Sequence, residues 1–339
     1  MSNIQGNNIQ DNNIQDKHDK PAEQPLNSTR SLLLLYLKGL AMGLGDSVPG
    51  ISGGTIAVIT NIYDKLILSI RAIDQQACAL LFSARLAEVW RHINGTFLLI
   101  LFLGILSGLL LSANTVLYLL ANYFAPLMAF FIGLVLASCW LLKNEFSATE
   151  WQNLCALCLG ILFVAAISVV SPRAAEMTYF YVFFSGIIGI SAMILPGLSG
   201  AFILLLLGVY EFILGALLEF NLPYLLVFVA GCAIGLLALC RILAWLLLNY
   251  HQRSYGFITG MLLGSLLVLW PWQQVLNFYT DSSGNNHSLQ TINVSPLNYA
   301  ELSGEDPMLV AVLLSIVVGV LVVVLLNFLS NSKFMTVSD

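Results

Sequence analysis

Long apolar runs that carry almost no charge dominate this sequence. An α-helix needs about 20 residues to cross the hydrocarbon core of a bilayer, and each run approaches that length. The predicted membrane-spanning helices are six segments, at about 96–121, 123–142, 151–171, 223–250, 255–270 and 308–329. Composition agrees, because only 9% of the residues are charged, whereas soluble domains carry about 25%. The chain is therefore predicted to be a polytopic membrane protein.

Two further apolar stretches, 32–70 and 179–217, are interrupted in the middle by proline, glycine and serine. Proline and glycine break a helix and permit a sharp reversal of the chain. Each stretch is therefore predicted to be a broken-helix, re-entrant hairpin that enters and leaves the membrane on the same side. The helix-breaking residues are Pro49 and Gly50 in the first turn and Pro196 and Gly197 in the second.

The two interrupted stretches are copies of each other. At an offset of 147 residues, the run that begins at Pro49 matches the run that begins at Pro196, and Tyr63-Asp64 matches Tyr210-Glu211. At a second offset of 127, Gly104-x-x-x-Gly108 matches Gly231-x-x-x-Gly235. The change in offset equals an extra connection at 71–95 in the first half. The sequence therefore predicts an internal duplication.

The duplication divides the chain into four predicted parts. These are a disordered cytoplasmic tail at 1–30, a first membrane repeat at 31–175, a second membrane repeat at 176–330 and a cytoplasmic C-terminal tail at 331–339. The N-terminal tail repeats Asn-Ile-Gln three times and is too polar to build an apolar core of its own.

Basic residues in the connections predict the orientation, because such residues are enriched in cytoplasmic loops. Their lysine and arginine residues predict that the N-terminal tail, residues 71–95 and the C-terminal tail lie in the cytoplasm. The acidic 271–307 loop is predicted to lie outside. Three crossings follow each hairpin, so the repeats have opposite topology. The predicted fold is all-α, with two inverted repeats that each contain a broken-helix hairpin and three transmembrane helices. Such repeats are typical of secondary transporters.

The paired turns are the predicted site for an anionic substrate. A helix begins after each turn, and the N–H groups and positive dipole end of a helix N-terminus attract anions. The residues predicted to bind this anion are Ser52, Gly53, Gly54, Thr55, Ser199 and Gly200. The alternative is that the small residues only let helices pack closely, which is the favoured interpretation for the Gly104 and Gly231 motifs.

Charged residues inside apolar stretches are further candidates, because ionisable groups are costly in a bilayer. Asp46 and Glu211 are predicted to couple transport to a proton or sodium ion, and the alternative role of Asp46 is to cap the following helix. Arg241 and Lys38 are predicted phosphate ligands, because arginine in particular matches phosphate geometry. Their alternative role is to extend to the membrane surface. Interfacial anchoring explains Asp64 and Lys65.

Histidine and cysteine give little support for other chemistry. The six cysteines fall mostly in apolar segments, the Cys155-x-x-Cys158 pair has no second pair, and no histidine lies near the turns. We therefore predict no metal site, no cofactor, no catalytic residue and no nucleic-acid partner. A membrane enzyme that acts on lipid phosphate remains the alternative from another class, although such chemistry needs a nucleophile, a base or a metal cluster in one place.

The first turn also resembles a known signature. The run from Gly45 through Asp46 to Thr55, followed by Ile62-Tyr63-Asp64, resembles the signature of the PopT family of polyprenyl-phosphate translocases, formerly a domain of unknown function. The resemblance covers roughly 31–330. Family members usually have Ala-Asp in place of Gly45-Asp46.

This resemblance implies a bacterial inner-membrane flippase that works by alternating access. It would return undecaprenyl phosphate from the outer to the inner leaflet, so that the carrier lipid of cell-wall synthesis is reused. The sequence has no phosphate-binding loop of the Gly-x-x-x-x-Gly-Lys-Ser/Thr type, so ATP is not the predicted energy source. A carrier of a small soluble anion is the alternative within transport.

Overall fold

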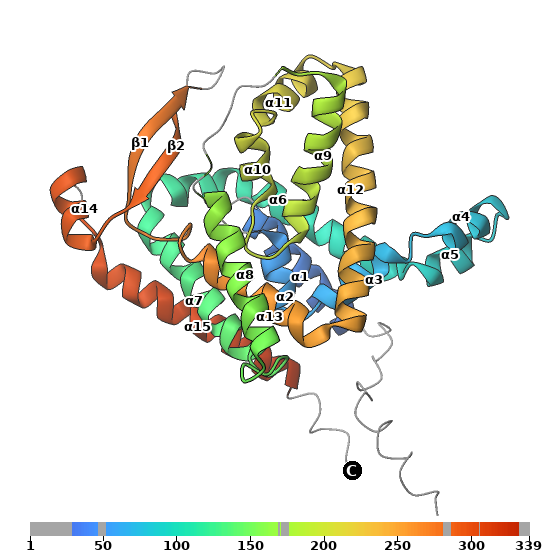
Figure 1. The fold of residues 1–339 in the computed structure, drawn as a ribbon, viewed down its shortest axis with the longest axis horizontal. Helices are drawn as coiled ribbons and strands as arrows, with labels where there is room; N and C mark the ends of the chain where they lie inside the picture. The colour runs from blue at the N-terminus through green and yellow to red at the C-terminus, as the bar shows by residue number, and fades with distance from the viewer. Residues whose placement is uncertain are drawn as a thin grey trace, which may run out of the picture.

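The computed structural model describes residues 29–46, 52–168, 170, 176–280, 286–304 and 306–331, and Figure 1 shows their arrangement. The predicted N-terminal tail lies outside the described residues except for Thr29 and Arg30, which begin the first helix. The predicted C-terminal tail also lies outside them except for Asn331. The turn residues Pro49 and Gly50 are likewise outside the described part of the chain.

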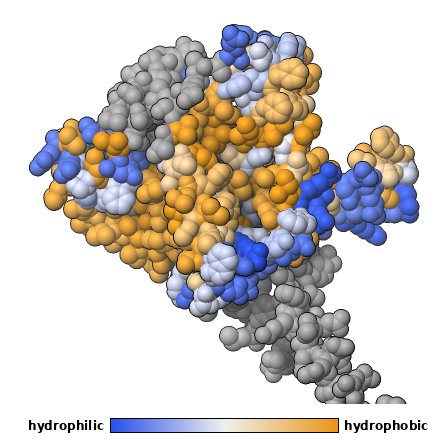
Figure 2. Space-filling view, viewed as in Figure 1, coloured by the Kyte–Doolittle hydropathy of each residue, from blue (hydrophilic) through white to orange (hydrophobic). Residues whose placement is uncertain are grey.

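Each of the six predicted spans corresponds to a helix. Four of these helices are long and apolar enough to cross a membrane: α6 (Gly95–Asn122), α7 (Phe124–Leu142), α8 (Trp151–Ser168) and α12 (Leu222–Asn249). The other two are α13 (His251–Ser265) and α15 (Leu309–Asn331). Apolar residues cover most of the face seen in Figure 2, and hydrophilic residues gather at its two ends and on the projecting parts. The protein is therefore a polytopic membrane protein.

Each interrupted stretch forms three consecutive helices where two were predicted. The first stretch contains α1 (Thr29–Asp46), α2 (Gly53–Ile59) and α3 (Tyr63–Arg71), and the second contains α9 (Tyr179–Ile194), α10 (Gly200–Leu206) and α11 (Tyr210–Leu218). The additional bend follows the short middle helix, and α10 and α11 are bent by 103°. A residue with positive φ occupies this bend in both stretches, Asn61 at 56° and Gly208 at 68°.

The bounds of the helices repeat at the offsets found in the sequence. The helices α2 and α3 begin 147 residues before α10 and α11, and α6 and α7 begin 127 residues before α12 and α13. The agreement extends to backbone angles at a junction: Tyr123 has φ −138° and ψ 41°, and Tyr250 has φ −134° and ψ 47°. Equivalent elements therefore follow one another in both halves.

Glycine lets the long helices approach closely. The helix α1 packs along α6, and α9 packs along α12. A Cβ atom on Gly104 would collide with the Tyr36 carbonyl oxygen, and one on Gly231 would collide with that of Phe183. The packing interpretation of these two motifs is therefore confirmed.

The remaining long helices pair between the two halves. The helix α7 packs along α15, and α8 packs along α13. The helices α7 and α8 belong to the first half, and α13 and α15 belong to the second. Each half therefore supplies one helix to each pair. Close approach again requires glycine, because a Cβ on Gly133 would collide with the Ile316 carbonyl oxygen and one on Gly260 with that of Leu157.

Two connections contain more structure than was predicted. The 71–95 segment forms α4 (Gln75–Phe82) and α5 (Leu86–His92), which project from the body in Figure 1. The 271–307 segment, predicted as a loop, contains an antiparallel hairpin of β1 (Gln273–Thr280) and β2 (Asn286–Asn293), followed by α14 (Pro296–Ser303). The fold is thus all-α in its membrane-spanning part, as predicted, with a two-stranded hairpin added in one connection. These strands lack the strict alternation of apolar and polar residues that would reveal them in the sequence.

Candidate functional site

The two helix breaks contact each other directly. The Gly197 N–H donates a hydrogen bond to Thr55 Oγ1 at 2.9 Å, and Ser52 Oγ donates to the Leu195 carbonyl oxygen at 3.1 Å. The approach is close, because a Cβ on Gly54 would collide with the Ile194 carbonyl oxygen. The N-terminal end of α2 therefore lies against the C-terminal end of α9. The breaks of the two halves form one site.

The serine of each turn caps the helix that follows. Ser52 Oγ accepts a hydrogen bond from the Thr55 N–H at 3.3 Å, and Ser199 Oγ accepts one from the Phe202 N–H at 3.4 Å. Both serines are buried and extended in backbone conformation, as N-caps usually are. The hydroxyls thus satisfy N–H groups that would otherwise be open to an anion.

The carboxylate of Asp46 lies in the first turn and binds a main-chain N–H group there. The Gly53 N–H donates to Asp46 Oδ1 at 2.5 Å, and a Cβ on Gly53 would lie 2.7 Å from Asp46 Oδ2. The equivalent position in the second turn is Met193, whose Cβ lies 3.0 Å from where a Cβ on Gly200 would be. A carboxylate therefore caps α2, as the alternative role for Asp46 required, whereas an apolar side chain fills the equivalent space at α10.

Lys38 lies at the opposite end of α2. Its Nζ donates to the carbonyl oxygen of Thr60, the C-cap residue, at 2.7 Å. The equivalent carbonyl in the second half belongs to Leu207, and it accepts a hydrogen bond from Tyr181 Oη at 2.7 Å. Both halves therefore satisfy the same main-chain carbonyl, with a cation in one case and a phenol in the other.

Arg241 and Glu211 lie outside the cluster formed by the turns. Arg241 is exposed on α12, and its Nη2 donates to the Ile73 carbonyl oxygen at 3.4 Å, beyond the end of α3. An open groove of about 380 Å³ adjoins it and is lined by Asp74, Gln75, Gln76 and Arg241. Glu211 is exposed in the first turn of α11, where an acid stabilises the helix dipole.

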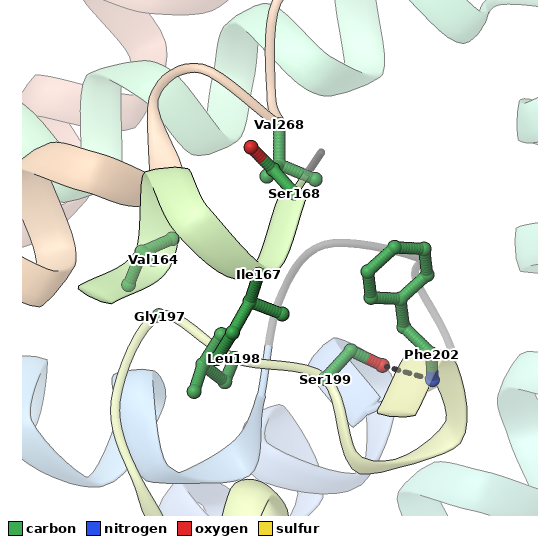
Figure 3. A pocket seen from close by; sticks show the side chains of 8 residues that line it. All are labelled: Val164, Ile167, Ser168, Gly197, Leu198, Ser199, Phe202 and Val268. Atoms are coloured by element: carbon green, nitrogen blue, oxygen red, sulfur yellow. Dashed lines mark hydrogen bonds between the residues drawn. The ribbon is translucent and has the colours of Figure 1, made fainter. Parts of the chain in front are cut away.

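A small cavity adjoins the second turn (Figure 3). Its lining comes from the C-terminal end of α8, the second turn and the segment after α13: Val164, Ile167, Ser168, Gly197, Leu198, Ser199, Phe202 and Val268. Its volume of about 10 Å³ has room for roughly one water molecule. A larger ligand can reach the turn only if the helices around it separate.

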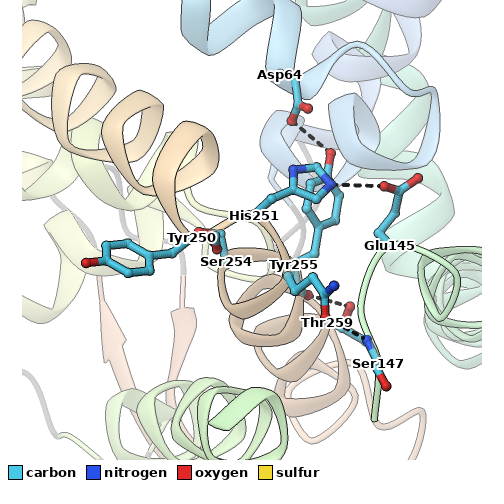
Figure 4. Close-up of polar contacts among 9 residues, drawn as sticks. Asp64, Glu145, Ser147, Tyr250, His251, Ser254, Tyr255 and Thr259 are labelled. Atoms are coloured by element: carbon cyan, nitrogen blue, oxygen red, sulfur yellow. Dashed lines mark hydrogen bonds and ion pairs between the residues drawn. The ribbon is translucent and has the colours of Figure 1, made fainter. Parts of the chain in front are cut away.

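A polar network between the two halves was missed by sequence reasoning (Figure 4). Tyr255 Oη, on α13, donates to Asp64 Oδ1 on α3 at 2.8 Å. His251 Nε2 lies 3.1 Å from Glu145 Oε2. The Tyr63 hydroxyl is buried and has no hydrogen-bond partner among the described residues. The motif marked Asp64, but its partner Tyr255 is distant in sequence, so no local signal connected the two.

The middle of the molecule is asymmetric. The helix α3 packs along α12 of the other half. The equivalent helix α11 has its main contacts with α10 and α12, which belong to its own half, and it lies at the top of Figure 1. The third helix of the first hairpin is therefore docked against the opposite half, whereas α11 has its main contacts within its own half.

Comparisons with known proteins agree with this architecture. Residues 42–287 match the family described as undecaprenyl phosphate translocase-like. A Vibrio cholerae protein named polyprenyl-phosphate transporter is 44% identical over 277 residues, which cover 82% of this chain and 90% of that protein. A Staphylococcus aureus protein of the same name is 32% identical over 253 residues, which cover 69% of this chain and 85% of that protein. No solved structure gives a significant match.

Proposed function

The chain belongs to the undecaprenyl phosphate translocase-like family, and from this premise we propose that it carries undecaprenyl phosphate across the bacterial inner membrane. Transport would run from the outer to the inner leaflet. The observation that carries the proposal is the contact between the two helix breaks, in which the Gly197 N–H meets Thr55 Oγ1. Secondary transporters bind their substrates where discontinuous helices of two repeats meet.

We propose that the two halves, 31–175 and 176–330, are inverted repeats. The pairing of the helices supports this, because α1 with α6 corresponds to α9 with α12, and α7 with α15 corresponds to α13 with α8. In the second correspondence each half contributes one helix to each pair. A two-fold axis between two repeats produces such pairs. The distribution of lysine and arginine in the connections supports opposite orientations in the membrane.

The phosphate would bind between the turns once they separate. Ser52, Thr55 and Gly197 now satisfy one another, so separation exposes two hydroxyls and a main-chain N–H. Hydroxyl and N–H donors suit a phosphate monoester in a site of low dielectric constant. The isoprenoid tail would stay in the lipid between apolar helices, which removes the need for a large cavity.

Asp46 would couple this step to a cation. Its carboxylate accepts the hydrogen bond from the Gly53 N–H that a phosphate would need. Protonation removes the negative charge that competes with the phosphate, so proton uptake favours substrate binding. A proton gradient directed into the cell would then drive the lipid phosphate inward. A sodium ion bound to the carboxylate would have the same effect on charge.

We propose that this conformation is closed towards the cytoplasm. The packing of α3 on α12 and the hydrogen bond from Tyr255 to Asp64 join the halves on the basic side of the molecule. The small cavity lies at the other side, near the ends of α8 and α13. Opening between α3 and α12 would bring the phosphate past Arg241, which we place at the exit rather than at the turns.

Reconstituted vesicles test the proposal. A fluorescent short-chain polyprenyl phosphate is added, and the fraction in the outer leaflet is measured by its hydrolysis with an added phosphatase. We expect protein-dependent exchange between leaflets that is fastest with acid on the side from which lipid leaves, and that is lost in Thr55→Val. Absence of exchange in the wild type contradicts the proposal. Uptake of free phosphate indicates a soluble-anion carrier, and release of phosphate before phosphatase is added indicates an enzyme.

A further inference from the structure

The helical hairpin α4–α5 has no counterpart in the second half. Residues 72–94 join α3 to α6, whereas Glu219, Phe220 and Asn221 alone join the equivalent helices α11 and α12. The duplicated helices are complete without it in one half, so the hairpin is an addition to the transport core rather than part of it.

The hairpin is fixed at its base. Trp90 Nε1, on α5, donates to Thr96 Oγ1 on α6 at 2.9 Å, and the Trp90 ring fills the space beside Gly95. Asn94 Nδ2 donates to Ser69 Oγ on α3 at 3.2 Å. The first contact connects α5 to α6, and the second connects the N-cap residue of α6 to α3. The hairpin therefore projects in a defined direction.

A second contact holds its two helices together. His92 Nε2, at the end of α5, lies 3.2 Å from Asp74 Oδ1, at the start of α4. The Ala77 N–H donates to the same oxygen at 2.9 Å and lowers the pKa of Asp74, so the carboxylate is ionised at neutral pH. The carboxylate thus caps α4 and positions α5 at once.

The outer part of the hairpin is apolar and uncovered by any described part of the chain. The exposed fractions are 90% for Phe82, 65% for Leu86 and 54% for Leu81. In Figure 2 the projection is hydrophobic at its upper part and hydrophilic below. Exposed apolar residues grouped in this way mark a surface that binds another apolar surface.

Charge and position identify that surface as lipid. The helix α5 ends at His92 and the span in α6 begins at Gly95, so the hairpin lies where the chain enters the bilayer. Tryptophan is enriched at that depth, and Trp90 is at the base of the hairpin. With Arg71 at the end of α3, the hairpin residues Arg85 and Arg91 make three arginines against the two acids Asp74 and Glu88, one of which pairs with Arg85. The excess of positive charge complements anionic headgroups.

We propose that α4–α5 is an interfacial foot, which inserts Phe82, Leu81 and Leu86 among the lipids of an anionic membrane surface. Arg71 and Arg91 lie beside the headgroup phosphates. The foot is linked to α3 through Asn94 and Ser69, and it therefore holds the first half at a fixed depth while α9–α12 move. This inference does not depend on the identity of the transported molecule.

Spin-label depth measurements on the full chain test the foot. The six native cysteines are replaced, and single cysteines are introduced at Phe82 and Leu86 as reporters and at Gln76 as the matched control. Labels are compared in vesicles with and without phosphatidylglycerol, using oxygen and a water-soluble nickel chelate as relaxing agents. We expect an oxygen-to-nickel accessibility ratio several-fold higher at 82 and 86 than at 76. Paired Arg71→Gln and Arg91→Gln substitutions should reduce that ratio in anionic vesicles only.

Three results overturn the proposal. The first is equal nickel accessibility at 82, 86 and 76, which means that the hairpin stays in water. The second is exclusion of both relaxing agents at 82 together with spin–spin broadening, which means that two copies of the chain meet there. The third is an immersion that does not change with the two arginine substitutions, which removes the anionic surface as the partner.

Discussion

The helix break around Ser52 and the break around Ser199 have the same backbone and different neighbours. Both begin with a capping serine, continue into a seven-residue helix and end at a residue with positive φ. The first break has Asp46 and Lys38 at the two ends of its short helix. The second has Met193 and Tyr181.

This difference separates what the fold requires from what the chemistry requires. Main-chain groups at membrane depth must be satisfied by protein, and both Lys38 and Tyr181 meet that requirement at equivalent carbonyls. Asp46 also satisfies a main-chain group, the Gly53 N–H, but the second break forms with Met193 at the equivalent position, so the fold does not require a carboxylate there. We therefore expect substitutions that exchange residues between the breaks to separate stability from coupling.

The largest effect is expected for Gly54→Ala, which gives the first break the residue found at the equivalent position 201. The new Cβ collides with the Ile194 carbonyl oxygen, which is backbone and cannot yield cheaply. We expect a loss of about 3 kcal/mol in unfolding free energy and loss of transport, measured by thermal unfolding in detergent and by the vesicle assay.

Two substitutions serve as its controls. Ala201→Gly should cost no more than about 1 kcal/mol, because only helix propensity changes. Gly215→Ala meets no atom within 4 Å in α11 and should be neutral or slightly stabilising. If Gly54→Ala is as mild as these, the breaks do not depend on their close contact.

Asp46→Met makes the first break resemble the second. Loss of the cap on Gly53 should cost about 2 kcal/mol. Asp46→Asn keeps an oxygen acceptor, so it should cost less and should mainly abolish the dependence of transport rate on pH. Vesicle transport measured across a pH series checks this. A pH dependence that persists in Asp46→Asn assigns the coupling to another group.

Lys38→Met and Tyr181→Phe remove the donors to the two equivalent carbonyls. A hydrogen bond from a charged group contributes more than one from a neutral group, so we expect losses of about 1.5 kcal/mol and about 1 kcal/mol, respectively. Thermal unfolding of both variants in the same detergent measures the difference. Equal losses mean that the charge of Lys38 adds nothing at this position.

An effect as small as that of Tyr181→Phe is expected for Tyr255→Phe, which removes the hydrogen bond to Asp64 between the halves. A loss of about 1 kcal/mol corresponds to a shift of about fivefold towards a form open at the α3–α12 contact. Tyr63→Phe is the matched control, because that hydroxyl has no partner among the described residues. Labelling rates of a cysteine placed at Ile73 should rise in the first variant and stay constant in the second.

Features that are set by residues close together in the sequence could be predicted from it. The apolar runs located the spans, and the glycine and serine pattern located both breaks and the repeat offsets. Features that depend on packing could not. Interfacial anchoring explains Asp64 at the level of sequence, yet Asp64 contacts Tyr255, and Glu211, predicted to couple transport, is exposed. Arg241 contacts the segment after α3 because α12 packs on α3 with that side turned towards it. No pattern in the sequence indicates which side of α12 faces α3.

The pairing of α7 with α15 and of α8 with α13 has a consequence for biosynthesis. Both α7 and α8 are synthesised long before their partners α15 and α13. Until then, the helix faces at Gly133 and Gly160 are exposed to lipid. Neither half can complete its own packing. Two fragments made separately and divided near residue 175 should therefore be short-lived alone and should rescue each other when they are expressed together.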